Sequence, residues 1–276
     1  MHVIERDTLR SPMEATKQLS RGQVAQLSGR IAMSIPNTFH FIWMGGRALN
    51  IVHYLAIKSA VEVNRPKQVS FYCDAIPTGI WFDKIRAQLD VVHRSLPKTV
   101  FGRPLAFPEH GVDQLKYDIL LANGGIYLDL DTMCKKPFAD LLDNPCVLGW
   151  EGTGGELPGL RGCCNGVVLA EKGSEFLRMW RESYRFYSGH WDVHSVVVPA
   201  ILASLHPHQV KMMPPTSFHY PLWNQIDLLF VENHDYPDAY CHHLWNKKSA
   251  RHIERLTEEA IRQQDTTYNV IARRYL

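Results

Sequence analysis

The stretch GGIYLDLDTMCKKPF, residues 124–138, decides how this sequence is interpreted. Two glycines precede the short apolar run IYL, and two aspartates, Asp129 and Asp131, follow it one residue apart. Two neighbouring carboxylates usually stay ionised together only if water surrounds both or a cation lies between them. Residues i and i+2 of an extended segment point the same way, so both carboxylates can face one ion. The stretch is therefore either the solvated end of a strand or half of a metal site.

The segments before this stretch alternate between strand and helix patterns. We expect strands at 38–44, 68–74, 90–96 and 126–128, and helices at 50–64, 80–89 and 111–125. Such alternation predicts a mostly parallel sheet with helices on both faces. In open α/β sheets ligands bind at the carboxyl ends of the strands, so the aspartate pair sits where a ligand is expected.

The second half of the chain is less regular. It predicts strands at 146–152, 163–171 and 238–245, and helices at 174–187, 193–205 and 249–263. We find no internal repeat, low-complexity tract or linker. We therefore expect a helical N-terminal extension over residues 1–34 and a single domain over residues 35–276.

The bulk composition is that of a globular protein. With 276 residues and 45% hydrophobic residues the chain can bury a sizeable core, and its net charge of +2 gives no sign of nucleic-acid binding. No apolar run approaches the roughly 18 residues of a membrane span, and residues 1–19 lack the apolar centre of a signal peptide. We expect a soluble, cytoplasmic protein, with attachment to a membrane surface or export as alternatives. The cysteines show no CxxC spacing and are expected to be reduced thiols: Cys73, Cys134, Cys146, Cys163, Cys164 and Cys241.

Two further motifs have side chains that suit a nucleotide. In HFIWMGG, residues 40–46, Trp43 lies beside two glycines and can stack on a flat ring, although a core tryptophan followed by a turn is the simpler interpretation. In CHHLWNKKS, residues 241–249, one of the two histidines can complete a metal shell begun by two carboxylates. The lysines and serine after it, at an expected helix start, suit a diphosphate. The alternative is a His-rich surface strand followed by a capped basic helix.

The three motifs support one another. Mg²⁺ and Mn²⁺ prefer carboxylate oxygens together with phosphate oxygens of a substrate. A ring binder, a cation binder and a phosphate binder make one nucleotide-diphosphate site. A phosphatase of the haloacid dehalogenase type also places two aspartates after a strand, but it requires Thr or Val where this chain has Met133, and it uses the first strand. We do not favour it.

The motifs HFIWMGG, DQLKYDILLANGGIYLDLD and HLWNKKS, in this order between residues 35 and 249, resemble the DXD-containing glycosyltransferases. That family holds the yeast initiating mannosyltransferase, the globotriaosylceramide synthases and, more distantly, the clostridial glucosylating toxins. The resemblance implies an α/β fold of the GT-A type, with a mostly parallel central sheet flanked by helices. It also implies Mn²⁺ or Mg²⁺, a nucleotide-sugar donor, most often a UDP-sugar, and retention of the anomeric configuration.

The resemblance also implies roles for individual residues. The expected metal ligands are Asp129, Asp131 and His243. The expected catalytic set adds two residues that face the donor sugar, Asp113 and Asn165, with an Asn-Gly turn as the alternative for Asn165. The expected nucleotide and diphosphate contacts are Trp43 with the backbone of Phe41 and Ile42, Lys116, Tyr127, Asp129, Trp245, Lys248 and Ser249.

The chain departs from the family pattern at two places. Lys116 stands where the family usually has Arg, which keeps the charge but loses the bidentate fork. Asp192 lies in a segment that differs from the usual Gly-Pro sequence, and it either binds sugar or caps a helix; we favour the cap.

The resulting hypothesis is a metal-dependent retaining glycosyltransferase. It would move a hexose or N-acetylhexosamine from a UDP-sugar to a glycan or lipid-linked acceptor. Without a Golgi-type membrane anchor, it is expected to be a bacterial enzyme of polysaccharide biosynthesis. The alternatives are an effector that glycosylates a host protein and a non-catalytic module that binds nucleotide sugars.

Overall fold

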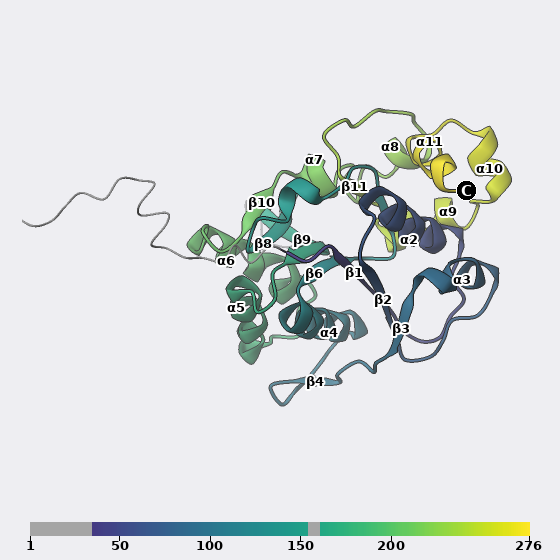
Figure 1. Ribbon diagram of the computed structural model, residues 1–276. Helices are drawn as coiled ribbons and strands as arrows, with labels where there is room; N and C mark the ends of the chain where they lie inside the picture. The colour runs from purple at the N-terminus through teal and green to yellow at the C-terminus, as the bar shows by residue number, and fades with distance from the viewer. Residues whose placement is uncertain (1–34, 154–160) are drawn as a thin grey trace, which may run out of the picture. The chain divides into compact units, whose positions relative to one another are not determined.

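The computed structural model describes residues 35–153 and 161–276, so the expected N-terminal extension lies outside the described residues. Its centre is a seven-stranded sheet in the order β10-β8-β9-β6-β1-β2-β3 (Figure 1). The strands are β1 (Thr38–Trp43), β2 (Gln68–Cys73), β3 (Asp90–His93), β6 (Gly125–Leu128), β8 (Cys146–Thr153), β9 (Arg161–Ala170) and β10 (Lys211–Met213). β9 pairs antiparallel with β6 and with β8, and the other pairings are parallel. The expectation of a mostly parallel central sheet is confirmed.

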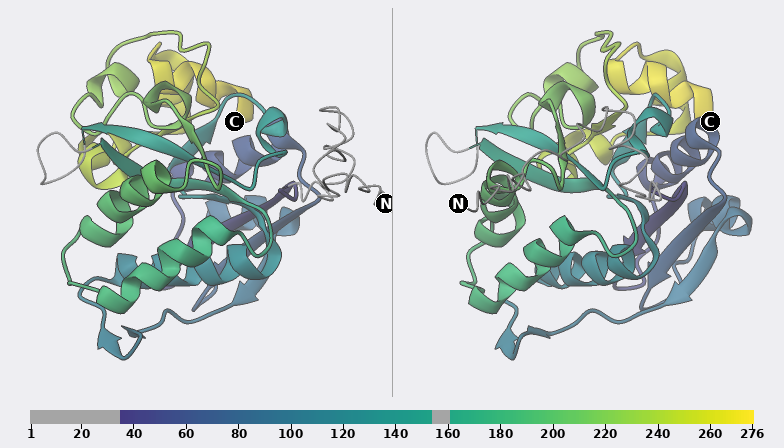
Figure 2. Two further views of the ribbon diagram at one scale, coloured as in Figure 1. Left: turned by 90° about the vertical axis from the view of Figure 1, so that its left-hand side faces the viewer. Right: turned by 60° about the vertical axis from the view of Figure 1, so that its left-hand side comes forward.

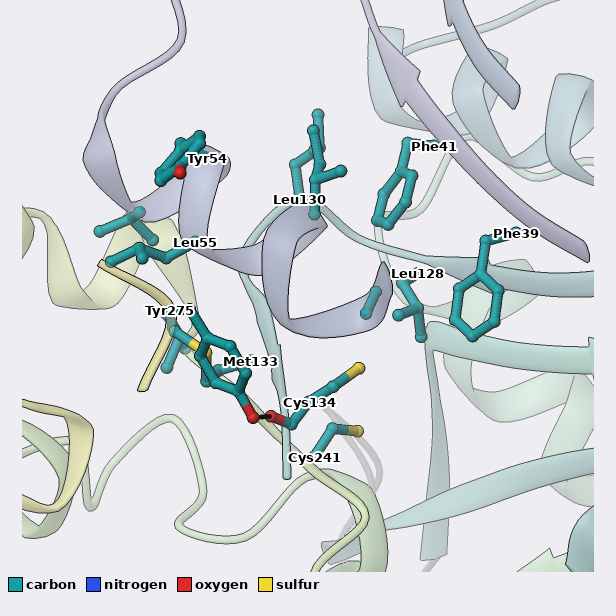
Figure 3. Packing of buried hydrophobic residues seen from close by; sticks show 14 of the residues in the cluster. Phe39, Phe41, Tyr54, Leu55, Leu128, Leu130, Met133, Cys134, Cys241 and Tyr275 are labelled. Carbon is teal, nitrogen blue, oxygen red and sulfur yellow. Dashed lines mark hydrogen bonds between the residues drawn. The ribbon is translucent and has the colours of Figure 1, made fainter. Parts of the chain in front are cut away.

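Side-chain alternation along the strands divides the buried residues into two cores, one on each face of the sheet. On β1, Phe39 and Phe41 join one core while Ile42 joins the other. Figure 3 shows part of the first core, to which Phe39, Phe41 and Leu128 of the sheet and Leu55 of helix α2 (Ile51–Asn64) belong. The second core is made with helices α4 (Pro108–Asn123) and α5 (Glu175–Ser183). Helices therefore cover both faces of the sheet, as the views in Figure 2 show.

Smaller elements surround the central sheet. A two-stranded sheet joins β7 (Thr132–Cys134) to β11 (Cys241–His243). The remaining elements are α3 (Ile80–Ile85), β4 (Thr99–Val100), β5 (Arg103–Pro104), α6 (Val198–Leu205), α7 (Pro215–Phe218), α8 (Asp227–Phe230), α9 (Asn246–Ile253), α10 (Glu258–Gln263) and α11 (Thr267–Ala272). Among the described residues, we find no helix with the length and apolar character needed to cross a bilayer.

The C-terminal elements differ from two expectations. The strand expected over residues 238–245 is limited to Cys241–His243. The single helix expected over residues 249–263 is wrong, because α9 ends at Ile253 and a new helix, α10, begins after Thr257. Thr257 has extended backbone and its side chain accepts the Ala260 N–H, which makes it a helix N-cap. The apolar spacing continues from α9 into α10, but Thr257 begins a new helix within it.

Candidate functional site

Asp129 and Asp131 lie in a tight turn that joins β6 to β7. The Asp129 N–H donates to the Gly166 carbonyl at 2.8 Å, and the Thr132 N–H donates to the Asp129 carbonyl at 3.0 Å. The expectation that the two aspartates share an extended segment is therefore wrong, because the chain reverses between them. The turn nevertheless aims both carboxylates at His243.

His243 completes a compact group with the two aspartates. Its Nε2 lies 3.2 Å from Asp131 Oδ1 and 3.7 Å from Asp129 Oδ2. Ligand atoms of all three side chains lie within 4.8 Å of one another. Pairing of β11 with β7 sets His243 opposite Thr132, so the neighbouring His242 faces away and its Nδ1–H donates to the Tyr220 carbonyl at 2.9 Å. As expected from the strand pattern, only one histidine of the pair faces the aspartates.

Each charge in this group changes the protonation of the others. Burial by itself would raise the pKa of Asp131, but attraction to His243 and the Asn246 N–H bond at 2.7 Å outweigh it and lower that pKa. Burial raises the pKa of Asp129. Attraction to Lys116 reduces this rise, and repulsion from Asp131 adds to it. Burial would lower the pKa of His243, but the carboxylate of Asp131 raises it well above its usual value. Two carboxylates with one neutral imidazole suit Mn²⁺ or Mg²⁺, so binding of a cation here would compete with a proton on His243.

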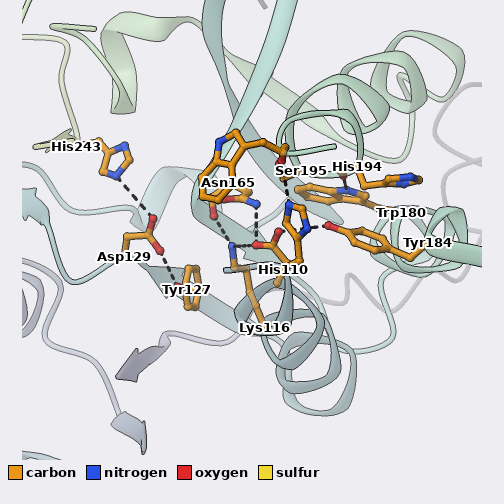
Figure 4. A network of polar contacts seen from close by, with 12 residues as sticks. His110, Lys116, Tyr127, Asp129, Asn165, Trp180, Tyr184, His194, Ser195 and His243 are labelled. Atoms are coloured by element: carbon orange, nitrogen blue, oxygen red, sulfur yellow. Dashed lines mark hydrogen bonds and ion pairs between the residues drawn. The ribbon is translucent and has the colours of Figure 1, made fainter. Parts of the chain in front are cut away.

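A second polar network connects α4, β6 and β9 beside the aspartates (Figure 4). The Lys116 ammonium, on a residue only 1% exposed, donates to Asp113 Oδ1 at 3.1 Å and to the Asn165 carbonyl at 2.9 Å. The Asn165 amide also donates to Asp113 Oδ1 at 2.8 Å, and Tyr127 donates to Asp129 Oδ1 at 2.6 Å. The lysine nitrogen lies 4.5 Å from the centroid of the Tyr127 ring. Lys116 thus neutralises Asp113 inside the protein, and its contact with a donor stays a prediction.

The expected base-binding residues lie at the end of β1. Trp43 is half-buried, its indole N–H donates to the Arg47 carbonyl at 2.8 Å, and its ring centroid lies 4.6 Å from that of His53. The side chains of Phe41 and Ile42 are buried in the two cores. Only their backbone can therefore meet a ligand, which is the role that the family resemblance implies.

The expected diphosphate residues lie where β11 leads into α9. Trp245 has a left-handed backbone, with φ of 56°, and its ring centroid lies 4.2 Å from that of His243. Lys248 is exposed. Ser249 is fully buried and its hydroxyl donates to the Leu244 carbonyl. Trp245 thus borders the carboxylate group through His243, the Ser249 hydroxyl is engaged within its own turn, and the contact of Lys248 with a diphosphate stays a prediction.

Sequence interpretation missed several residues of the site. Cys164, treated only as a reduced thiol, places its Sγ 3.6 Å from His243 Nδ1. Gly166 leaves space for the site, since an added Cβ would lie 3.0 Å from Asp129 Oδ2 and 3.2 Å from His243 Cε1. Tyr184 donates to Asp113 Oδ2 at 3.3 Å. The motif CCNG contained two of these residues, but nothing in it indicated that they meet residues 243 and 129.

Asp192 requires a correction. It precedes the π-helical segment Val193–Val197, and its backbone carbonyl accepts the N–H groups of Val196 and Val197. Its side chain makes no capping hydrogen bond to that segment, so the favoured capping role is wrong.

Known proteins resemble this chain in sequence. Residues 22–148 match the family described as a glycosyltransferase sugar-binding region containing a DXD motif. Glucan organizing enzyme 1 of the fungus Cryptococcus neoformans is 31% identical over 265 residues, which cover 88% of this chain and 71% of that protein. The chain belongs to the DXD-containing glycosyltransferase family. The GT-A fold class expected from the sequence is thereby confirmed, together with glycosyltransferase activity.

Other similarities of this glycosyltransferase are partial or distant. Subversion of eukaryotic traffic protein A of Legionella pneumophila is 35% identical over 77 residues, covering 26% of this chain and 11% of that protein. The crystal structure of the glycosyltransferase GlyE of Streptococcus pneumoniae has a TM-score of 0.48 at 14% identity, covering 87% of this chain and 60% of that chain. The galactosyltransferase LgtC, crystallised with donor and acceptor sugar analogues, has a TM-score of 0.43 at 14% identity, covering 81% of this chain and 98% of that chain.

Proposed function

We propose that this glycosyltransferase is metal-dependent and transfers a hexose or N-acetylhexosamine from a UDP-sugar, with retention of the anomeric configuration. The main support for this proposal is that Asp129 and Asp131 of the β6–β7 turn meet His243 of β11. A carboxylate pair of which Asp131 is buried and Asp129 half-buried is costly without a neighbouring positive charge, and these three residues would hold Mn²⁺ or Mg²⁺. Bound there, the cation would neutralise charge on the departing diphosphate.

The remaining side chains are suited to binding and orienting the donor. Trp43 would stack on the base, and Tyr127 would contact the base or ribose. Asp113 and Asn165, already fixed by Lys116, would hold hydroxyls of the donor sugar. Preorganised groups of this kind cost no rearrangement during the reaction.

The leaving group and the acceptor share one face of the donor sugar in this mechanism. Lys248 and Trp245 would cover the diphosphate as it departs. The acceptor hydroxyl would attack the anomeric carbon from the face that the diphosphate leaves, and the departing phosphate oxygen would take its proton. The proposal therefore needs no nucleophile from the enzyme.

A glycan is the favoured acceptor. The relative that matches most of this chain is named a glucan organizing enzyme, which supports a polysaccharide or another glycan acceptor. The match to the Legionella protein is limited to 77 residues and gives weaker support to an effector that modifies a host protein. A cytoplasmic location and a bacterial origin stay predictions, since these two relatives come from a fungus and a bacterium.

The proposal is tested by thermal stabilisation with UDP and with GDP, each with and without Mn²⁺, for the wild type and Asp131→Ala. A ligand at about 100 times its dissociation constant adds about 2.7 kcal/mol to the free energy of unfolding. We expect stabilisation by UDP that requires Mn²⁺ and disappears in the variant. If neither nucleotide raises the melting temperature, the donor and metal assignments are wrong. If GDP alone raises it, the donor is a GDP-sugar and not a UDP-sugar.

A further inference from the structure

A cavity of about 560 Å³ lies next to the proposed diphosphate residues. Its lining includes Trp223, Asn224, Gln225, Asp227, Lys248 and Arg251. Trp223 is 45% exposed, and the Lys248 ammonium lies 5.3 Å from the centroid of its indole ring. Trp223 therefore presents part of a flat apolar ring to the cavity beside the side-chain amides of Asn224 and Gln225.

Two residues near His243 in the sequence, His242 and Trp245, hold the backbone just before Trp223. The His242 Nδ1–H donates to the Tyr220 carbonyl at 2.9 Å, and the Trp245 indole N–H donates to the Pro221 carbonyl at 2.9 Å. These bonds fix the backbone just before Trp223 relative to His243. Lys248, which also lines the cavity, belongs to the helix whose first N–H binds Asp131 at 2.7 Å. The segments that line the cavity are therefore tied to the neighbours of His243 and Asp131.

The charges of the cavity largely satisfy one another. Arg251 donates to Asp227 Oδ1 at 2.9 Å, and His252 lies 3.1 Å from the same oxygen. Lys248 is assigned to the diphosphate by the proposed function. What is left for a ligand is the exposed part of the Trp223 indole with the Asn224 side chain and the NH2 group of Gln225 beside it, since Gln225 Oε1 accepts the Leu222 N–H at 3.4 Å. This combination suits a neutral pyranose, whose C–H face stacks on an aromatic ring while its hydroxyls bond to amides.

We propose that this cavity is the acceptor subsite and that it binds a neutral hexose unit of a glycan against Trp223. The inference rests on the proposed function. In that mechanism the acceptor hydroxyl attacks from the face that the diphosphate leaves, so the acceptor must lie beside the diphosphate. Lys248 lines the cavity and is also the proposed diphosphate residue, which places the two substrates on either side of one side chain.

The chain offers a matched control for Trp223. A second cavity, of about 470 Å³, is lined by Trp81 and by Ile253 and Glu254 at the far end of α9. The Lys84 ammonium lies 4.4 Å from the centroid of the Trp81 ring, so this tryptophan also has a lysine beside it. Trp81 lines no part of the first cavity.

The experiment compares wild type, Trp223→Ala, Trp223→Phe and Trp81→Ala, each with its melting temperature measured. Binding of maltotriose, laminaritriose, cellotriose and lactose is followed by saturation-transfer NMR in the presence of UDP and Mn²⁺. Transfer from UDP-glucose, UDP-galactose and UDP-N-acetylglucosamine is then measured for every sugar that binds. We expect Trp223→Ala to raise the acceptor KM at least tenfold and to abolish the NMR signal, while Trp223→Phe keeps most of both and Trp81→Ala resembles the wild type.

Binding of the donor is measured in separate experiments. Stabilisation by UDP and Mn²⁺ should be the same in Trp223→Ala as in the wild type, and the KM for the donor should not change. The subsite is overturned if none of the four sugars binds the wild type, or if Trp223→Ala binds and glycosylates them normally. Absence of UDP binding by the wild type would instead remove the proposed function, and sugar binding that depends on Trp223 would then identify a sugar-binding cavity that is not an acceptor subsite.

Discussion

Nε2 of His243 lies 3.2 Å from Oδ1 of Asp131, although the two residues are far apart in the sequence. The contact is created by the pairing of β11 with β7, which sets a strand from the C-terminal part of the chain beside the DXD turn. Asp131 is in addition fixed by the Asn246 N–H through its other oxygen. These two contacts fix the orientation of the Asp131 carboxylate, so that its Oδ1 faces His243 before any cation binds.

Replacing Asp131 by Asn should reduce the rate of sugar transfer by at least about 100-fold, or about 2.7 kcal/mol of transition-state stabilisation. The amide is nearly isosteric, so the fold should persist while the charge facing His243 is lost. Steady-state kinetics at saturating Mn²⁺ measure the effect, with the exposed Asp143→Asn as the control. Full activity of Asp131→Asn under these conditions would show that Asp131 is not a metal ligand.

Gly166→Ala tests the space beside the carboxylates. The added Cβ would lie 3.0 Å from Asp129 Oδ2, closer than ordinary van der Waals contact, so Asp129 or His243 must shift. We expect about tenfold more Mn²⁺ to be needed for half-maximal stabilisation by UDP, which corresponds to about 1.4 kcal/mol. A circular dichroism melt of the metal-free variant shows whether the fold is kept. An unchanged Mn²⁺ requirement would mean that the site accepts a methyl group here.

Cys164 acts on His243 from the side away from the aspartates. Contact of its Sγ with Nδ1 at 3.6 Å orients the ring and leaves Nε2 facing Asp131. Partners of metal-binding histidines typically contribute about 10- to 100-fold to metal affinity. Cys164→Ala should weaken Mn²⁺ binding by about that factor, and Cys164→Ser should be closer to the wild type.

The neighbouring cysteine supplies the control for this prediction. Cys163 is also buried, but it precedes Cys164 directly in strand β9. Because successive side chains of a strand point to opposite faces, its thiol points away from His243. Cys163→Ala should leave Mn²⁺ affinity unchanged. Equal effects of the two alanine variants, measured by calorimetry, would indicate a packing defect instead of an effect on His243.

Lys116→Met should lower the free energy of unfolding by about 3 kcal/mol, because it leaves the buried carboxylate of Asp113 without its counter-charge. Hydrogen bonds from Asn165 and Tyr184 to that carboxylate keep the loss at the lower end of the range for broken buried ion pairs. Urea denaturation measures it. The exposed Lys98→Met should change stability by less than about 0.5 kcal/mol.

His40 should make the protein less stable in acid. Burial lowers its pKa, opposed by its bond to the Gly124 carbonyl at 2.9 Å. As pH falls through about 6.5, the unfolded chain takes up a proton that folded His40 does not, so stability falls with pH by at most about 1.4 kcal/mol per pH unit from this residue. His40→Gln should flatten the dependence of unfolding free energy on pH between about 5 and 7. The exposed His93→Gln should not, and equal slopes for His40→Gln and the wild type would contradict the prediction.

Local patterns were enough to predict the central sheet except for its edge strand β10 (Lys211–Met213). The helix α4 and the turn after it follow from apolar spacing and from Gly124 and Gly125, both of which adopt positive φ, at 69° and 115°. Alternation of strand and helix patterns was also enough to place Asp129 and Asp131 at the carboxyl edge of that sheet. The boundary after Ile253 was missed because a threonine cap ends a continuous apolar pattern, and pattern length carries no information about capping.

The sequence by itself determined which residue types the site contains: a carboxylate pair, a histidine, lysines, and tryptophans beside glycines. Only the tertiary structure decided which of them meet. It brought Cys164 and Gly166 against His243, turned Lys116 inward onto Asp113, and opened a cavity beside Trp223. The physical reason is that side-chain direction within a strand or helix follows from local periodicity, whereas contacts between β7, β9 and β11 depend on sheet pairing between distant segments, which no local pattern encodes.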